Sequence, residues 1–228
     1  MSDHPDTGLV TSYMTLRKFI GILGLALPLA LLAGGQFIFH TGLRPSLSDY
    51  YHTGMRDVFV GTLCAIGVFL VSYRGNERKD NIAGNIACFF AVSLSLFPCA
   101  PEAPTQSEKT IGHLHFIFAA AFFLTLVYFS LFLFTLTDKR VQPTRRKLMR
   151  NRVYRVCGGL MLACVAGIAV FKLALSDAWV RDNRIVFWLE TVAITAFGVS
   201  WLVKGEAILA DEEQSDPGEL IATGTSGN

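Results

Sequence analysis

Six long apolar segments constrain what this chain can fold into. Each approaches or exceeds the roughly 17–25 residues that an α-helix needs to cross the hydrocarbon of a bilayer. Lipid offers no partner for a free backbone group, so segments of this kind are expected to be helical. Hydrophobic residues make up 52% of the 228 residues, which is more than an ordinary soluble domain carries. The sequence therefore predicts an all-α fold, an integral membrane six-helix bundle with helices over residues 19–39, 58–73, 82–97, 111–136, 153–175 and 185–203.

The basic residues predict the orientation of this bundle. If the N-terminus is cytoplasmic, fourteen of the twenty Lys and Arg residues fall in cytoplasmic segments. Such an excess is typical of the inner side of a membrane, so both termini are predicted to be cytoplasmic. The expected location is a bacterial cytoplasmic (inner) membrane, crossed several times. The remaining six basic residues lie on the outer face: Arg44, Arg56, Lys109, Lys172, Arg181 and Arg184.

Two polar tails flank the predicted transmembrane domain of residues 17–204. Residues 1–16 are polar and irregular, and residues 205–228 are acidic and rich in Gly, Ser and Thr. Both compositions are typical of disorder. The five cysteines show no spacing typical of a metal site or a disulfide framework. Four lie within apolar segments, and only Cys99 lies at a helix end, without an obvious partner.

The chemically most diverse segment is SLSDYYHTGMRD, residues 46–57, which on this topology lies on the outer face. Its first four residues match a capping box, which predicts a short helix. If that helix continues, Ser48, Asp49, His52 and Arg56 share one quadrant of its surface.

The candidate roles follow from these residue types. The candidate catalytic residues are Ser48, Asp49, His52 and Asp57, although Asp57 would point away from His52 in a continuous helix. The candidate substrate-binding residues are Arg56, Tyr50, Tyr51 and Arg184. The alternative is an interfacial helix with both tyrosines in the aromatic belt of the membrane and its charges solvated.

Three further residues suggest a metal site. Glu190 interrupts an apolar segment, where an ionisable residue is costly and usually faces a partner or a cavity. Alternatively, its carboxylate reaches water near the helix end. His113 and His115 are two positions apart, so on a helix only one of them can face a common site. His52, one of these two histidines and Glu190 would form an open three-ligand zinc site that lowers the pKa of a bound water to about 7.

Two resemblances bear on these residues. The Ser48-x-x-x-His52 spacing resembles one motif of the alkaline ceramidase and adiponectin-receptor superfamily, which implies a membrane-embedded zinc site that hydrolyses lipid amides or esters. That family's second motif, His-x-x-x-His in its last helix, is missing here: only His113-x-His115 exists, in the fourth predicted helix, and six spans are expected instead of seven. The segment from Ser48 to Gly61 and the segment from Phe197 to Trp201 together resemble a family of bacterial polytopic membrane proteins, which implies a fold type and no activity.

The sequence thus leaves three functional hypotheses. The first is a hydrolase-like enzyme, with or without a bound metal, that acts on a lipid or amphipathic substrate at the outer leaflet. The second is a non-enzymatic protein that binds a lipid head group, a small ligand or a partner subunit at the same residues. The third is a transporter or proton path. The lipid bilayer is an expected partner in each case, a nucleic acid is not, and a homo-oligomer or partner subunit is compatible with all three.

Overall fold

The computed structural model describes residues 5–73, 75, 78–136, 142 and 144–209, with side chains described from residue 13 onward. These residues form helices and contain no β-strand, which confirms the predicted all-α fold class. The elements are α1 (Pro5–Phe37), η1 (Ser48–His52), α2 (Arg56–Ser72), α3 (Arg78–Leu96), α4 (Gln106–Tyr128), η2 (Phe129–Leu133), α5 (Arg145–Ala174), α6 (Asp177–Asp182) and α7 (Ile185–Lys204).

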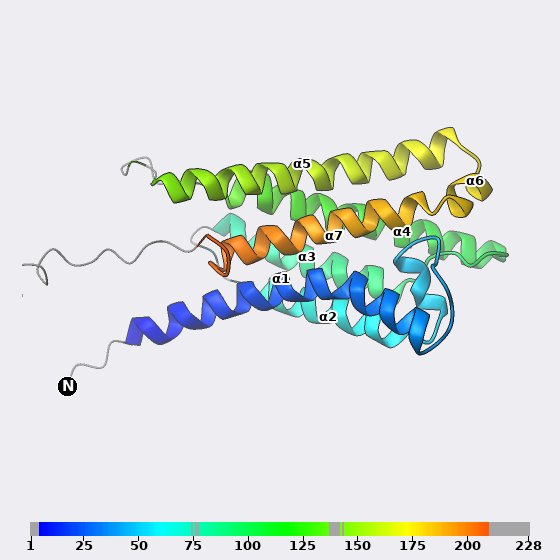
Figure 1. Cartoon of the computed structure of the whole chain (residues 1–228), viewed down its shortest axis with the longest axis horizontal. Coiled ribbons are helices and arrows are strands. Elements are labelled where there is room, and N and C mark those ends of the chain that lie inside the picture. The colour runs from blue at the N-terminus through cyan, green and yellow to red at the C-terminus, as the bar shows by residue number, and fades with distance from the viewer. Residues whose placement is uncertain (1–4, 74, 76–77, 137–141, 143, 210–228) are drawn as a thin grey trace, which may run out of the picture.

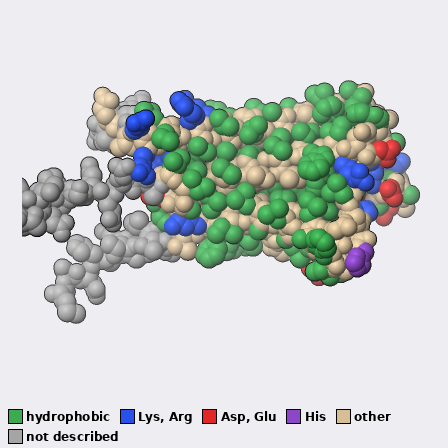
Figure 2. Space-filling model, viewed as in Figure 1, with side chains coloured by type: hydrophobic (Ala, Val, Ile, Leu, Met, Phe, Trp, Pro, Cys, Tyr) green, Lys and Arg blue, Asp and Glu red, His purple; other side chains and the backbone are tan. Residues whose placement is uncertain are grey.

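The long helices pack side by side along one axis (Figure 1). Contacts join α1 to α2, α2 to α3, α3 to α4, α4 to α5, α5 to α7 and α7 back to α1. Each long helix therefore has a neighbour on both sides. Hydrophobic side chains cover the middle of the face in Figure 2, and charged side chains gather toward its two ends.

Four of the described helices are long and apolar enough to cross a membrane. They include residues 13–37 of α1, the α4 helix with its π-helical extension η2, and the whole of α5 and α7. This finding supports a membrane protein. The α2 and α3 helices have 17 and 19 residues, which corresponds to rises of about 26 and 28 Å at 1.5 Å per residue.

All the long helices except α7 begin earlier than their predicted apolar segments. The α1 helix starts at Pro5, inside the predicted tail of residues 1–16, and Pro is well tolerated in a first helical turn. The α4 helix starts at Gln106 because Thr105 and Glu108 form a complete capping box. At α5 the Thr144 side chain accepts a hydrogen bond from the Lys147 backbone. The predicted C-terminal tail of residues 205–228 lies outside the described residues from position 210.

Close packing of α1 on α7 depends on glycine. A Cβ atom added to Gly21 would lie 2.8 Å from the Gly198 carbonyl oxygen, and one added to Gly198 would lie 2.9 Å from the Gly21 carbonyl oxygen. Small residues of this kind allow helix backbones to approach closely in membranes. The contact fixes α7 against α1 and so positions Glu190 of α7 beneath the chain that follows α1.

The two ends of the bundle differ in composition. The Asp49 end consists of residues 38–55, 97–105 and 175–184, and the Trp201 end consists of the start of α1, the end of α7 and the neighbouring ends of α2 to α5. In the described part of the chain, α1 begins and α7 ends at the same end of the bundle (Figure 1).

Candidate functional site

Asp49 is the buried centre of the Asp49 end. The short helix η1 presents it, and its backbone N–H donates a 2.9 Å hydrogen bond to the Ser46 hydroxyl, as one half of the predicted capping interaction. The Asp49 side chain is only 3% exposed. Its Oδ2 accepts a 3.2 Å hydrogen bond from Arg44 and lies 3.7 Å from a guanidinium nitrogen of Arg181 in α6. Two cations thus offset the cost of burying this carboxylate.

Glu190 of α7 binds residues 47 and 48, which follow α1 in the chain. Its carboxylate accepts hydrogen bonds from the Leu47 N–H at 2.7 Å, the Ser48 N–H at 3.5 Å and the Ser48 hydroxyl at 3.3 Å. The carboxylate therefore satisfies backbone donors that η1 cannot satisfy itself. The predicted zinc site pairs Glu190 with histidines, whereas in the structure its carboxylate is bound by Leu47 and Ser48.

Two more contacts join the same segments. The Phe187 N–H donates to the Pro45 carbonyl at 3.0 Å, and the Arg184 Nε donates to the Leu43 carbonyl at 3.2 Å. Arg184 adopts a left-handed conformation with φ of 52° immediately before α7. The Arg184 side chain holds Leu43 against the start of α7. The substrate-binding role predicted for Arg184 stays a prediction.

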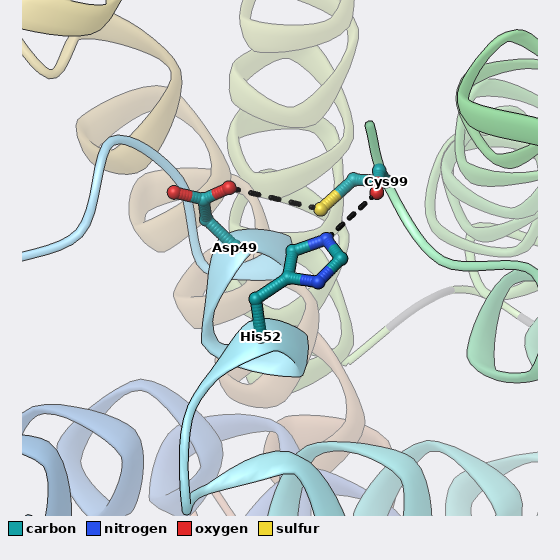
Figure 3. A group of neighbouring side chains, drawn as sticks. All are labelled: Asp49, His52 and Cys99. Atoms are coloured by element: carbon teal, nitrogen blue, oxygen red, sulfur yellow. Dashed lines mark hydrogen bonds between the residues drawn. The ribbon is translucent and has the colours of Figure 1, made fainter. Parts of the chain in front are cut away.

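His52 and Cys99 complete a cluster with Asp49 (Figure 3). The His52 Nε2 donates to the Cys99 carbonyl at 2.8 Å. The Cys99 thiol donates to the Ser48 carbonyl at 3.3 Å and lies 3.9 Å from Asp49 Oδ1. One ligand atom from each of the three side chains lies within 4.8 Å of the other two. Oδ1 of Asp49 therefore faces the cluster while Oδ2 faces the arginines.

The electrostatic environment of Cys99 disfavours a free thiolate. Burial raises the pKa of the Cys99 thiol, and the carboxylates of Asp49 and Glu190 raise it further, while Arg181 opposes them. The same negative groups would favour a bound cation, and a metal ligated by sulfur displaces the thiol proton.

The two histidines of α4 lie apart from this cluster. His113 is exposed, whereas His115 is buried and its Nδ1 donates to the Phe97 carbonyl at 2.6 Å. They face different surroundings, as their spacing predicts. The metal group that the described residues form contains neither of them nor Glu190. Of the predicted metal ligands, only His52 belongs to it.

The remaining predicted residues lie near the cluster without joining it. Arg56 donates a 2.8 Å hydrogen bond to the Tyr51 hydroxyl, and its guanidinium lies 4.6 Å from the centre of the Tyr51 ring. Tyr50 is fully buried against α1, and burial raises the pKa of its phenol. Asp57 is exposed in the first turn of α2, where the helix dipole favours a carboxylate.

Sequence reasoning missed three members of the site: Cys99, Arg44 and Arg181. Each lies outside the polar segment of residues 46–57, so spacing along the chain could not connect it to Asp49. One feature of the sequence could have identified Cys99. It lies at a helix end outside the apolar segments, whereas a cysteine within an apolar segment can be explained as a small hydrophobic residue.

The donor set of the cluster suits zinc. A thiolate, an imidazole and a carboxylate are all zinc ligands, and three protein ligands leave a fourth position for water. Coordination through His52 Nε2 would replace its hydrogen bond to the Cys99 carbonyl. Comparisons of the chain with protein-family models, with curated proteins and with solved structures find no match.

Proposed function

We propose that this chain is a six-span protein of a bacterial cytoplasmic membrane, with both termini cytoplasmic and the Asp49 end outside. The four membrane-length helices and the excess of basic residues at the Trp201 end support this arrangement. The α2 and α3 helices, each packed against two neighbours, complete the six spans in this proposal.

At the Asp49 end we propose a zinc-dependent hydrolase that acts on a lipid or another amphipathic substrate. The observation that carries this proposal is the convergence of ligand atoms from Asp49, His52 and Cys99 within 4.8 Å of one another. Zinc held in this way would supply a bound water with a pKa near 7, which is a nucleophile at neutral pH.

The protein residues around the cluster have defined tasks in this proposal. Arg44 and Arg181 hold Oδ2 of Asp49, so that Oδ1 stays directed at the zinc position. The Arg181 side chain is 30% exposed and can also reach an anionic group of the substrate. Glu190 acts as a positioning residue, because it fixes Leu47 and Ser48 at the start of η1.

Metal analysis of the purified full-length protein tests the proposal. Wild type should carry about one zinc per chain, and His52→Ala and Cys99→Ser should lose it. The matched control is His113→Ala, which removes an exposed histidine outside the cluster and should keep its zinc. Replacing zinc by cobalt should give a thiolate-to-cobalt charge-transfer band in wild type and none in Cys99→Ser.

Activity is the second measurement in this experiment. Zinc-loaded wild type in mixed micelles should release product from an ester or amide lipid, and His52→Ala should not. A wild type that binds no stoichiometric zinc or cobalt rules out the metal-dependent hydrolase.

One observation favours a second candidate function, a non-enzymatic binding or accessory protein. The Glu190 carboxylate is occupied by Leu47 and Ser48, and Asp49 is occupied by two arginines. The two buried carboxylates of the Asp49 end are therefore satisfied without a ligand. On this alternative the end presents the exposed Arg56–Tyr51 pair to a lipid head group or a partner subunit, and the folded protein contains no metal.

A further inference from the structure

A groove lies between α3 and α4, two helices that pack against each other. Its volume is about 430 Å³, within the range of about 300–1,000 Å³ that is typical of ligand sites. Exposed apolar side chains border it, Ile82 and Ile86 on α3 and Leu124 on α4. The buried Ala83 lies between the two isoleucines and has no side chain beyond Cβ to fill the space. We call this feature the α3–α4 groove.

The groove has one charged end and an apolar interior. Lys79, in the first turn of α3, and Tyr128, the last residue of α4, line it at the Trp201 end. Of its seven lining residues, all within the described ranges, Lys79 is the only charged one. The Thr125 hydroxyl donates to the Ala121 carbonyl at 2.8 Å, so it is already satisfied within α4. The groove continues along α3 from Lys79 to Ile86, a rise of about 10 Å at 1.5 Å per residue.

The Lys79 ammonium is available to a ligand. Lys79 is exposed, and it forms no hydrogen bond or ion pair in the part of the chain that the structure describes. The neighbouring carboxylate, Asp80, is buried and does not line the groove. A lysine at the end of a membrane helix lays its methylene stem along apolar surface and keeps its ammonium at head-group level. The cation and the apolar channel together therefore match an amphipathic anion.

Tyr128 is held at the mouth of the groove by its own helix. Its ring packs against that of Phe132, with 5.5 Å between ring centres. The π-helical turn η2 begins directly after it, at Phe129, and turns of this kind are frequent at functional sites. A tyrosine in this position combines an apolar ring with a hydroxyl that suits the interface of a bilayer.

We infer that the α3–α4 groove binds one anionic phospholipid. An acyl chain lies against Ala83, Ile86 and Leu124, and the phosphate lies beside Lys79. The inference rests on the proposed membrane placement of α3 and α4. It depends neither on the zinc site at the opposite end of the bundle nor on which end faces the cytoplasm.

Photo-cross-linking of the full-length protein in phosphatidylcholine vesicles tests the inference. The probe is phosphatidylglycerol with a photoreactive diazirine on one acyl chain, and peptide mass spectrometry locates the label. We expect the label to concentrate on residues 79–86 and 124–128, relative to the equally exposed apolar side chains of α1 and α5. A phosphatidylcholine probe with the same acyl chains should label these residues less, because it lacks the net negative charge that Lys79 attracts.

Two substitutions separate the acyl chain from the head group. Ile86→Trp fills the groove and should abolish the preferred labelling, whereas Ile117→Trp, on an exposed part of α4 that does not line the groove, should keep it. Ile82→Trp is the second blocking variant if Ile86→Trp does not fold. Lys79→Gln should lower the labelling by phosphatidylglycerol about fivefold, the usual effect of one lysine near anionic lipid. Arg152→Gln removes an exposed cation near the start of α5 and should change it little.

Three results would overturn the inference. The first is a label spread evenly over all lipid-facing helices, which would leave the membrane placement intact and reject the groove. The second is unchanged labelling in both blocking variants. The third is exclusion of the lipid probe together with cross-links between the α3 helices of two chains, which would assign the groove to a second copy of the protein.

Discussion

The Asp49 end and the Trp201 end are stabilised by different interactions. At the Asp49 end, hydrogen bonds and ion pairs join residues that are far apart in the sequence, such as Leu47 with Glu190 and Asp49 with Arg181. At the Trp201 end, rings from α7, from η2 and from the residues directly after α2 and η2 form a buried cluster, and charged side chains surround it. The stability of the Asp49 end therefore depends on hydrogen-bond geometry and on charge pairing. The stability of the Trp201 end depends on the apolar surface that its rings bury.

This difference determines how each end responds to change. Net contributions of single hydrogen bonds are about 0.5–1.5 kcal/mol, whereas deleting a buried aromatic side chain costs about 3–5 kcal/mol. The Trp201 end is therefore expected to be the more stable of the two. The Asp49 end can rearrange at a lower cost, which suits a site that must bind and release a ligand.

The largest expected effect is that of Trp201→Ala. The substitution empties a fully buried position among several rings, so the free energy of unfolding in detergent should fall by about 3–5 kcal/mol. Trp188→Ala in the same helix is the control, because Trp188 is 56% exposed and should lose much less. Equal losses for the two variants would show that the ring cluster is not the stabilising core of its end.

A smaller and more local effect is expected for Glu190→Ala. The variant leaves the Leu47 and Ser48 N–H groups without their acceptor, at a cost of about 1–3 kcal/mol. Amide hydrogen exchange should accelerate at residues 47 and 48 and stay unchanged around Trp201. Glu102→Ala removes a carboxylate that is 83% exposed at the same end and should change neither quantity. Faster exchange at both ends would mean that the two ends do not open separately.

The third effect concerns the pH dependence of Cys99. In metal-free protein its thiol pKa is raised, so at pH 8 its alkylation by iodoacetamide should be at least about tenfold slower than that of an exposed cysteine. The rate should continue to rise with pH above about 8.5, the ordinary thiol pKa, where an exposed thiol levels off. Peptide mass spectrometry follows both Cys99 and a cysteine introduced by Ser107→Cys. Identical pH profiles would contradict the predicted environment.

The sign of the stability effect follows from the same shift. A raised pKa means that the folded state holds the thiol proton more tightly than the unfolded state does. Cys99 therefore contributes stability that is fully present below the ordinary thiol pKa and is lost as the pH rises above it.

Long apolar segments carried enough information to predict the all-α class, because a continuous run of Phe, Leu and Val has few alternatives in lipid. The apolar segments did not predict the residues at which the helices begin. The Thr105–Glu108 capping box extends α4 into a polar stretch, and α1 continues back to Pro5. Apolar composition reports burial in a membrane, whereas helix starts depend on local capping.

The candidate site was predictable only in part. The polar segment of residues 46–57 was singled out from its composition, and Glu190 was singled out because a carboxylate is costly in an apolar helix. The residues that contact them depend on which helices pack together. The spacing of residues along a single sequence does not reveal that packing. For this reason Cys99 and Arg181 were not associated with Asp49. The ring cluster of Trp201, Phe134 and Tyr73 was missed because, in the sequence, each of the three is one more aromatic residue in or beside an apolar segment.

The hydrogen bond between Leu47 and Glu190 joins residues 143 positions apart. During synthesis the chain after α1 emerges long before the ribosome reaches α7, so the hydrogen bonds from Leu47 and Ser48 to Glu190 cannot form until α7 has been made. Residues 43–48 therefore lack the contacts with Phe187 and Glu190 while α2 to α5 are synthesised. Synthesis of α7 is therefore the step that completes the Asp49 end, and a chain truncated before Ile185 would lack these contacts.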